Sequence, residues 1–540
     1  MSNKRYKTLY EKNMYKLIQL CNTVVLIYTI LMFAVFPYYL RNAYSTSRED
    51  KYHFFVLLTL IALSAIAVLF AINYQHVPKN GVKVTIVEYI GRSKLNLADF
   101  SILAFWVINF LSAAFASLAG GDFMSFVSGT NGRNMGLLTI SMLVISYFLI
   151  SRMFCYKKYF FYITLIGMSF MSVLAVLNYY YIDPLNIFDN YSSQLNVIRN
   201  FTSTIGNKNY LSAMICVALP LAMGVAIATR DKVTYIIANI CVGIQFMSLI
   251  VATSDGGFLG CFVGISVLLL YSARDIKRFS RFFICASVIV ASGKLLWLFD
   301  IFMKGNNKGY TSFSRLFIYD HRIFFFIPVF IFLAILFSKI KDEDGKISKC
   351  TVVVVRIILL VFVIVCASLF IYYTSNPEIE TNEIASFFRF DEEWGTHRGF
   401  FWIKSFEMFK NFSFRETLFG VGPANFVEPF LIFDSELIAR YNETHADAAH
   451  NVYINYLITC GILGFFTYLV FILSVLRDAL RSAKNNPMAF MLLGALTAYL
   501  AQDFVNLANP VNTPWLFIII ALSQASFLKC NSPEHTKQTF

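Results

Sequence analysis

Charged residues are scarce in this chain of 540 residues, at 14% of the sequence. Because a typical globular domain has about 25% charged residues, the chain lacks the charge to cover several water-soluble domains. Hydrophobic residues instead reach 57%, and Phe alone occurs 57 times. The composition excludes a water-soluble enzyme, a coiled coil, a disordered scaffold and a disulfide-rich secreted protein. It predicts an all-α, polytopic membrane protein.

Cysteines are few as well, and their positions exclude a disulfide framework. Each of the ten falls in a long apolar run or in a segment predicted to face the cytoplasm. No CxxC pair suggests a zinc site. The sequence also lacks tandem repeats and low-complexity tracts, and no separate water-soluble domain is expected.

The apolar residues gather in about 14 runs that are long enough to cross a membrane, which takes about 20 residues. The two shortest runs are 135–151 and 512–528. The others lie near 17–39, 53–73, 99–119, 159–182, 209–229, 233–252, 256–272, 281–302, 322–338, 352–374, 450–475 and 487–505.

The formal net charge of +13 fits the distribution of basic residues around these spans. In a water-soluble protein it would suggest nucleic-acid binding, but no basic run here has interleaved aromatic residues. The first 16 residues hold five Lys or Arg and are therefore predicted to be cytoplasmic. Alternating the spans from that start puts most Lys and Arg inside. Both termini are then cytoplasmic.

The chain divides into three parts. Residues 1–199 form an N-terminal bundle of about five spans, residues 200–475 form a central membrane part, and residues 476–540 hold the last spans and a cytoplasmic tail. The central part contains one large outer loop, 375–449, which is rich in charge and interrupted by Gly and Pro. Loops of this length usually have a function, so we expect short helices and the active or binding face there.

Arg398, Trp402, Phe406 and Phe409 follow helical spacing within this loop. They predict a short amphipathic helix on the membrane surface, with Arg398 at its start. An arginine at this place can bind lipid headgroups, and its planar guanidinium also suits a phosphate group. A tight turn follows at Gly420-Val421-Gly422-Pro423. It is either a plain structural turn or a weak phosphate-binding signal, and no nucleotide motif follows it.

His450 lies where the outer loop re-enters the membrane, and Asp447 is a candidate N-cap of the helix that begins there. The histidine can serve as a general base or proton relay, or as an interfacial residue without chemistry. A third alternative is a metal site with His445 and Asp447, for which no fourth ligand is evident.

Two short outer turns precede spans, one at Gly206–Asn209 and one at Ser254–Asp255. Free N–H groups at the helix starts favour an anion such as a diphosphate, although each can also be a simple polar turn. Lys294, inside a predicted span, either pairs with Asp300 or reaches the outer face.

Together, these motifs resemble the O-antigen ligase and polymerase family of bacterial envelope glycan enzymes. The resemblance rests on Arg398 followed by Trp402, on the turn from Leu418 to Phe426, and on the stretch from Ala449-His450-Asn451 to Gly464. The Gly206–Asn209 turn is similar as well. The resemblance covers about residues 200–475 and makes this central part the ligase- or polymerase-like membrane core.

The resemblance implies an integral-membrane glycosyltransferase in the bacterial cell membrane. Such an enzyme transfers a glycan from a polyprenyl diphosphate to a hydroxyl of a glycan, lipid or other acceptor, in lipopolysaccharide or capsule synthesis. It needs no metal or other cofactor, and its catalytic residues are His450, which activates the acceptor hydroxyl, and Arg398, which holds the diphosphate. A histidine with its ordinary pKa of about 6.5 suits this role. The expected substrate-binding residues are Asn207, Asn209, Ser254, Asp255, Trp402, Gly420, Gly422 and Asn451.

One departure from the family concerns Asp255, which stands where relatives often have a second arginine for the diphosphate. The candidate replacements are basic residues on outer loops: Lys208, Lys304, Lys308, Arg315 and Arg322.

Two other classes of function remain. A transporter or flippase of lipid-linked glycans fits the span count, but the single large outer loop, the lack of half-repeats and the few intramembrane charges argue against it. A structural envelope protein without chemistry is the other alternative. The sequence does not separate ligase from polymerase.

Overall fold

The computed structural model describes residues 9–41, 46–74, 95–129, 133–188, 203–303, 309–340, 349–380, 382, 385–433 and 448–530. Within these residues the chain is helical and contains no β-strand, which confirms the predicted fold class. His445, Asp447, Lys304 and Lys308 lie outside the described residues.

Each predicted span corresponds to an apolar helix. Twelve described helices are long and apolar enough to cross a membrane, and the shorter helices α6 and α22 correspond to the two shortest predicted runs. A count of 14 crossings stays a prediction. The helices are α1 (Leu9–Ala34), α2 (Ser47–Tyr74), α4 (Leu97–Leu118), α6 (Leu137–Met153), α7 (Tyr159–Tyr179), α9 (Lys208–Ala228), α10 (Lys232–Val251), α11 (Asp255–Ser272), α12 (Ile276–Phe302), α14 (Phe326–Lys339), α15 (Lys349–Ser375), α20 (Val452–Ser482), α21 (Pro487–Gln502) and α22 (Thr513–Cys530).

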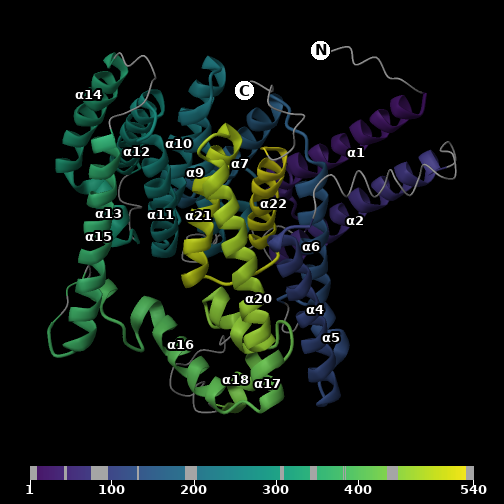
Figure 1. Cartoon of the computed structure of the whole chain (residues 1–540). Helices are drawn as coiled ribbons and strands as arrows, with labels where there is room; N and C mark the ends of the chain where they lie inside the picture. The colour runs from purple at the N-terminus through teal and green to yellow at the C-terminus, as the bar shows by residue number, and fades with distance from the viewer. Residues whose placement is uncertain are drawn as a thin grey trace.

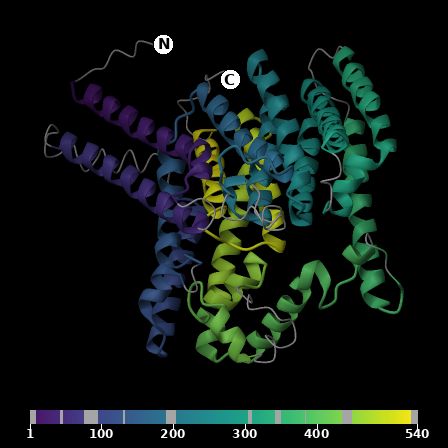
Figure 2. The ribbon, with the colours of Figure 1, turned by 180° about the vertical axis from the view of Figure 1, so that it is seen from behind.

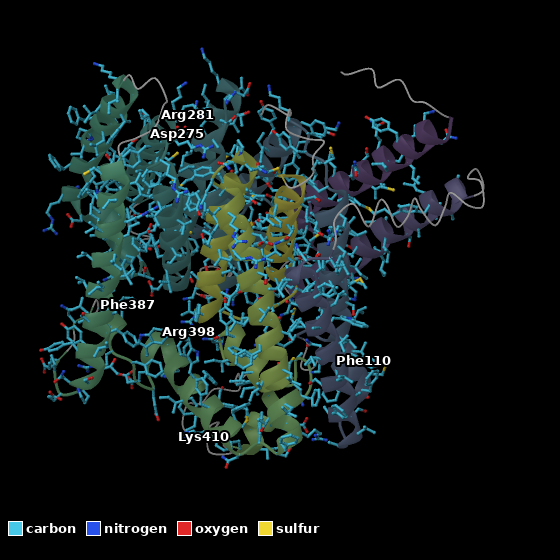
Figure 3. The ribbon with its side chains drawn as sticks, viewed as in Figure 1. Phe110, Asp275, Arg281, Phe387, Arg398 and Lys410 are labelled. Atoms are coloured by element: carbon cyan, nitrogen blue, oxygen red, sulfur yellow. The ribbon has the colours of Figure 1, made fainter. Side chains whose placement is uncertain are left out.

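The predicted outer loop forms a separate layer at one end of the bundle (Figure 1). It contains the 3₁₀ turn η6 (Ala385–Phe388) and the helices α16 (Trp394–Lys410), α17 (Phe414–Phe419) and α18 (Val427–Phe433). The start of α1 and the end of α22 lie at the opposite end, and α1 and α2 slant away from the other helices (Figures 1 and 2). Lys410 on α16 lies at one end, and Arg281 on α12 together with its N-cap Asp275 lies toward the other (Figure 3).

Among the twelve long apolar helices, the best buried are α9 and α21, whose most apolar segments are 94% and 89% buried inside the protein. Glycines allow them to approach their neighbours closely. A Cβ on Gly224 would lie 2.6 Å from the Met491 carbonyl oxygen, and one on Gly264 of α11 would lie 2.5 Å from the Gly494 carbonyl oxygen. In a bilayer, where burial of apolar surface gives little drive, such small-residue packing holds helices together.

The helices α14 and α15 are the opposite case. Only 6% of the most apolar segment of α14 and none of that of α15 is buried in the protein. The contacts of α15 with the rest of the chain include the Phe262–Phe362 ring pair with α11, at 5.0 Å. These two helices are therefore the ones that a bilayer would cover most completely.

The close contact between Gly264 and the backbone of α21 leads to a prediction for the Gly264→Ala variant. We expect this variant to lose about 1–3 kcal/mol of stability, because the added Cβ meets a backbone oxygen that cannot move alone. Gly243→Ala is the matched control, since its Cβ would lie 3.4 Å from the nearest atom. Thermal unfolding of both variants in the same detergent tests this, and equal melting temperatures would contradict it.

Candidate active site

The two polar turns that were predicted separately lie together at the N-terminal ends of α9 and α11. Asn207 caps α9 by accepting a hydrogen bond from the Asn209 N–H. Ser254, at the N-cap position of α11, donates to Asn209 Oδ1 at 2.9 Å. The preceding residue, Thr253, has a left-handed backbone conformation with a φ of 48°. The expected substrate-binding residues Asn209 and Ser254 therefore form one unit.

The end of α21 extends this unit through residues that the sequence analysis missed. Gln502 Nε2 donates to Ser212 Oγ at 2.9 Å, and Ser212 Oγ lies 3.1 Å from Ser254 Oγ. Gln502 Oε1 is buried and has no hydrogen-bond partner among the described residues. Asp503, only 3% exposed, follows in the chain. An acidic residue inside a predicted span is a functional candidate by default, and that signal was present in the sequence.

A left-handed turn at the start of α16 positions the Arg398 side chain. Gly395, Thr396 and His397 all have left-handed backbone conformations, with φ between 59° and 64°. Arg398 Nη1 donates to the Gly395 carbonyl oxygen at 2.6 Å. Burial lowers the pKa of Arg398, and the nearby Asp255 carboxylate opposes that shift. Arg398 therefore starts the regular part of the helix, as predicted.

The face that α16 buries differs from the predicted stripe. Phe401, Ser405 and Met408 are buried, whereas Phe406 is 47% exposed. Trp402 packs on Trp394, with ring centres 5.2 Å apart. Arg398 Nε and Trp402 Nε1 are buried donors without a hydrogen-bond partner in the described part of the chain. Since they are one helical turn apart, they share a face.

His450 has a left-handed conformation with a φ of 49°, directly before α20. The predicted N-cap Asp447 is wrong, because the α20 cap is Asn451, whose side chain accepts from the N–H groups of Tyr453 and Ile454. Burial, together with the positive charges of Arg398 and Arg133, lowers the pKa of His450 to about 3. The histidine is thus neutral at physiological pH, and the expected ordinary pKa of about 6.5 is wrong.

Arg133 is the cation that the sequence analysis missed. It precedes α6, is 6% exposed, and has its pKa lowered to about 10 by burial and by the neighbouring positive charge of Arg48. The positive charge of Arg133 lowers the pKa of His450. Arg322, one of the suggested replacements for the family arginine, instead forms an ion pair with Asp320, and its side chain is 91% exposed. Arg133 is the only basic residue between α4 and α6, which was a usable signal.

Close packing explains why the predicted turn contains glycine at positions 420 and 422. The N–H groups of Val421 and Gly422 donate to the carbonyl oxygens of Ile458 and Thr459, next to a kink of α20 at Gly461. A Cβ on Gly420 would lie 2.3 Å from the Thr459 carbonyl carbon. These contacts explain Gly420 and Gly422 as packing residues, and their contact with a substrate stays a prediction.

Lys294 and Asp300 do not pair with each other. Lys294 Nζ donates to the carbonyl oxygens of Ile318 and Asp320 at 2.9 and 2.8 Å, at the end of α13 (Ser312–Tyr319). Asp300 accepts from three tyrosine hydroxyls, those of Tyr180, Tyr310 and Tyr319. Both charges are held by structural contacts. Among the described residues, no group of His, Cys, Asp and Glu side chains suits a metal ion.

Most of the strained backbone in the described part of the chain lies at this site. Left-handed conformations in residues other than glycine cost about 1–3 kcal/mol each and gather at functional sites. Those that belong to or adjoin the site are Asn134, Thr253, Thr396, His397, Ala424 and His450.

Comparison with known proteins gives one family match. Residues 321–469 match the family model described as O-Antigen ligase. The matched segment includes Arg398, the Gly420–Gly422 turn and His450, and it confirms the resemblance predicted from the sequence. No curated protein matches the chain. The chain is thus a multi-pass membrane protein in which residues 321–469 are similar to the O-antigen ligase family.

The lowered pKa of His450 predicts a pH dependence of stability. The pKa of His450 is about 6.5 in the unfolded chain and about 3 in the folded chain. Between these two pH values, the unfolded chain binds a proton that the folded chain does not. Stability therefore falls as the pH drops through this window. His450→Gln should make the fall in melting temperature between pH 7.5 and pH 4.5 smaller. An unchanged fall would contradict a buried neutral histidine.

Proposed function

We propose that this chain is an integral-membrane glycosyltransferase of the O-antigen ligase or polymerase type. It transfers a glycan from a polyprenyl diphosphate to a hydroxyl of a glycan or lipid acceptor at the outer face of a bacterial cell membrane, with both termini cytoplasmic. The observation that carries the proposal is the neutral His450 beside Arg398 and the buried Arg133, with His450 and Arg398 both inside the segment that matches the ligase family.

The chemistry follows from the charges. The acceptor oxygen forms a bond to the anomeric carbon while the bond from that carbon to the diphosphate oxygen breaks, and the diphosphate leaves with the electron pair. Negative charge grows on the diphosphate, and Arg398 stabilises it in a site poor in water. The acceptor proton passes to the ring of His450. The displacement inverts the configuration of the anomeric carbon.

The low pKa of His450 is compatible with this role. A base with a pKa of about 3 is weak in the free protein, because two cations disfavour its protonation. A bound diphosphate brings negative charge to the same place and raises the pKa of the histidine. The base therefore gains strength only when the donor is present.

The remaining polar residues fit supporting roles. Asn451 fixes the start of α20 directly after His450. Asn209, Ser254 and Asp255 hold the outer ends of α9 and α11 next to Arg398, and the unpartnered Gln502 Oε1 and Trp402 Nε1 can bind hydroxyls of the donor glycan. No metal or other cofactor is required, since the diphosphate is already an activated leaving group.

The test is glycan transfer by purified protein in liposomes that contain lipid-linked glycans extracted from the native membrane. We expect His450→Ala and Arg398→Ala each to slow transfer by at least about 100-fold, without added nucleotide sugar or metal. Arg322→Ala is the matched control, because this arginine is exposed and paired outside the site. The length of the product ladder separates polymerase from ligase.

Two outcomes would overturn the proposal. Wild-type rates in both His450→Ala and Arg398→Ala would exclude their catalytic roles. Movement of lipid-linked glycan across the liposome membrane, with no new glycosidic bond, would assign the chain to transport instead.

A further inference from the structure

Two charged side chains are buried within α12, a helix that is long and apolar enough to cross a membrane. Lys294 is 4% exposed and Asp300 is 7% exposed. Charged residues inside a span are costly, and they usually serve a function. The proposed transfer reaction uses neither of them as a reacting group, so their contacts show what they contribute.

Lys294 holds the end of α13. Its Nζ donates to the carbonyl oxygens of Ile318 and Asp320 at 2.9 and 2.8 Å, and Asp320 is the C-cap residue of this helix. The last carbonyl groups of a helix have no partner within the helix, and a positive charge at that end interacts favourably with the helix dipole. α12 and α13 are close here, because a Cβ on Gly293 would lie 3.1 Å from the Phe317 carbonyl oxygen. The ammonium group therefore supplies the donors that the end of α13 lacks.

Asp300 holds the same helix through tyrosine hydroxyls. Its Oδ2 accepts from Tyr319, the last residue of α13, at 2.7 Å, and its Oδ1 accepts from Tyr310, just before the N-cap, at 3.1 Å. Tyr180, at the end of α7, donates to the same Oδ1 at 2.7 Å. Three hydroxyl donors replace the water that a buried carboxylate loses. The two charges of α12 thus fix both ends of α13.

α13 contacts the Ser254 side of the site. Ser314 Oγ donates to the Ile250 carbonyl oxygen at 3.0 Å, near the end of α10. The ring of Phe317 stacks on that of Phe258, near the start of α11, with ring centres 6.3 Å apart. α13 therefore supports both helices that flank the Ser254 turn.

α13 also contacts the Arg398 side. The ring centre of Phe313 lies 5.3 Å from that of Phe387 in η6. The Phe387 carbonyl oxygen accepts from Trp394 Nε1 at 3.0 Å, and Trp394 begins α16 shortly before Arg398. The position of α13 therefore sets how far Arg398 lies from the Ser254 turn.

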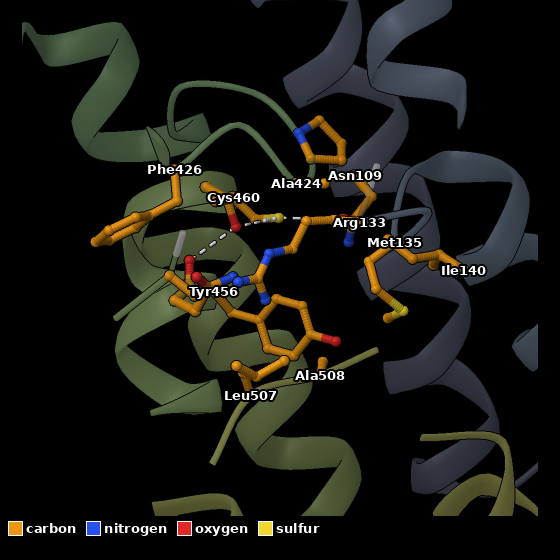
Figure 4. A pocket seen from close by; sticks show the side chains of 14 residues that line it. Asn109, Arg133, Met135, Ile140, Ala424, Phe426, Tyr456, Cys460, Leu507 and Ala508 are labelled. Atoms are coloured by element: carbon orange, nitrogen blue, oxygen red, sulfur yellow. Dashed lines mark hydrogen bonds between the residues drawn. The ribbon is translucent and has the colours of Figure 1, made fainter. Parts of the chain in front are cut away.

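Arg133 reaches the site by a different route. It lines a small cavity between α4, α20 and the turn at 423–426 (Figure 4), and no residue of α12 or α13 lines that cavity. The cavity volume of about 30 Å³ has room for about two water molecules. A shift of α13 should therefore move Arg398 and leave Arg133 in place.

We propose that Lys294 is a positioning residue of the transferase, which fixes α13 and thereby the distance between Arg398 and the Ser254 turn. Asp300 supports the same helix. The inference rests on the proposed transferase function and adds to it a residue that touches no substrate. In an active site, a displacement of about 1 Å can slow catalysis about 100-fold, which explains why two buried charges are used to hold one short helix.

The test is a double-mutant cycle on the rate of glycan transfer in liposomes. We expect Lys294→Met, which removes the charge and keeps a long side chain, to slow transfer about tenfold in the wild-type background. In the Arg398→Ala background it should slow transfer by less than about twofold, because the group that it positions is gone. In the Arg133→Gln background the effect should stay at about tenfold.

Matched variants separate positioning from a loss of folding. Ser314→Ala removes only the hydrogen bond from α13 to α10, and it covers the case in which Lys294→Met does not fold. It should slow transfer about threefold, again only while Arg398 is present. Ser280→Ala is its control and should transfer as the wild type does, since Ser280 Oγ donates in the same way to the Ala334 carbonyl oxygen, between α12 and α14.

Hydrogen exchange provides a readout that does not need transfer. Lys294→Met should exchange its amide hydrogens faster than the wild type in residues 312–319 and 394–398, because the support of α13 is lost. Equal slowing of transfer in the wild-type and Arg398→Ala backgrounds would overturn the proposal, and so would wild-type rates in both Lys294→Met and Ser314→Ala.

The same measurements distinguish this inference from the proposed function. Normal wild-type transfer, with unchanged exchange of α13 in Lys294→Met, would refute the positioning role and leave the transferase intact. A wild-type chain that transfers no glycan would refute the transferase, and the positioning role of Lys294 would fall with it.

Discussion

Two backbone hydrogen bonds, from Val421 and Gly422 to the carbonyl oxygens of Ile458 and Thr459, fix the layer of short helices α16–α18 onto the bundle of long helices. They are possible because Gly461 interrupts the regular bonding of α20 and because the turn has no Cβ at its closest approach. The same helix begins just after His450, and the ring of Phe401 on α16 lies 5.8 Å from the imidazole. The histidine and Arg398 are therefore both positioned from α20.

The site contains strained backbone and buried charged side chains, and both of these features lower the stability of the folded protein. A left-handed turn holds Arg398, and left-handed residues also adjoin Arg133 and Ser254. Each such residue, and each buried cation, costs free energy. The close packing of α9, α11 and α21 directly beneath provides a rigid support. An anion that binds between the cations would recover part of that cost, so the free site is prepared for negatively charged substrates.

The sequence predicted what depends on neighbouring residues and missed what depends on the fold. A run of apolar residues reveals a span by itself, and the order of motifs around Arg398 and His450 was enough to suggest the family whose model matches residues 321–469. Arg133 is 265 positions away from Arg398, and only the packing of α4 and α6 against α20 brings it to His450. Pairing with Asp300, one of the two alternatives left open for Lys294, does not occur, because residues six apart lie on different faces of a helix. The cap of α20 moved to Asn451 because the chain leaves its left-handed turn only after His450.

The scarcity of protein contacts along α15 has a consequence for how such a chain can change over generations. A helix surrounded by lipid needs only to remain apolar and long enough, so substitutions among Val, Ile, Leu and Phe in α15 can accumulate freely. In α9, where nearly every residue of the apolar segment is buried, a single added methyl group can meet the backbone of α21. Divergence between descendants of this protein should therefore run fastest in α15 and slowest in α9. The same contrast makes α15 the natural place for a fluorescent label.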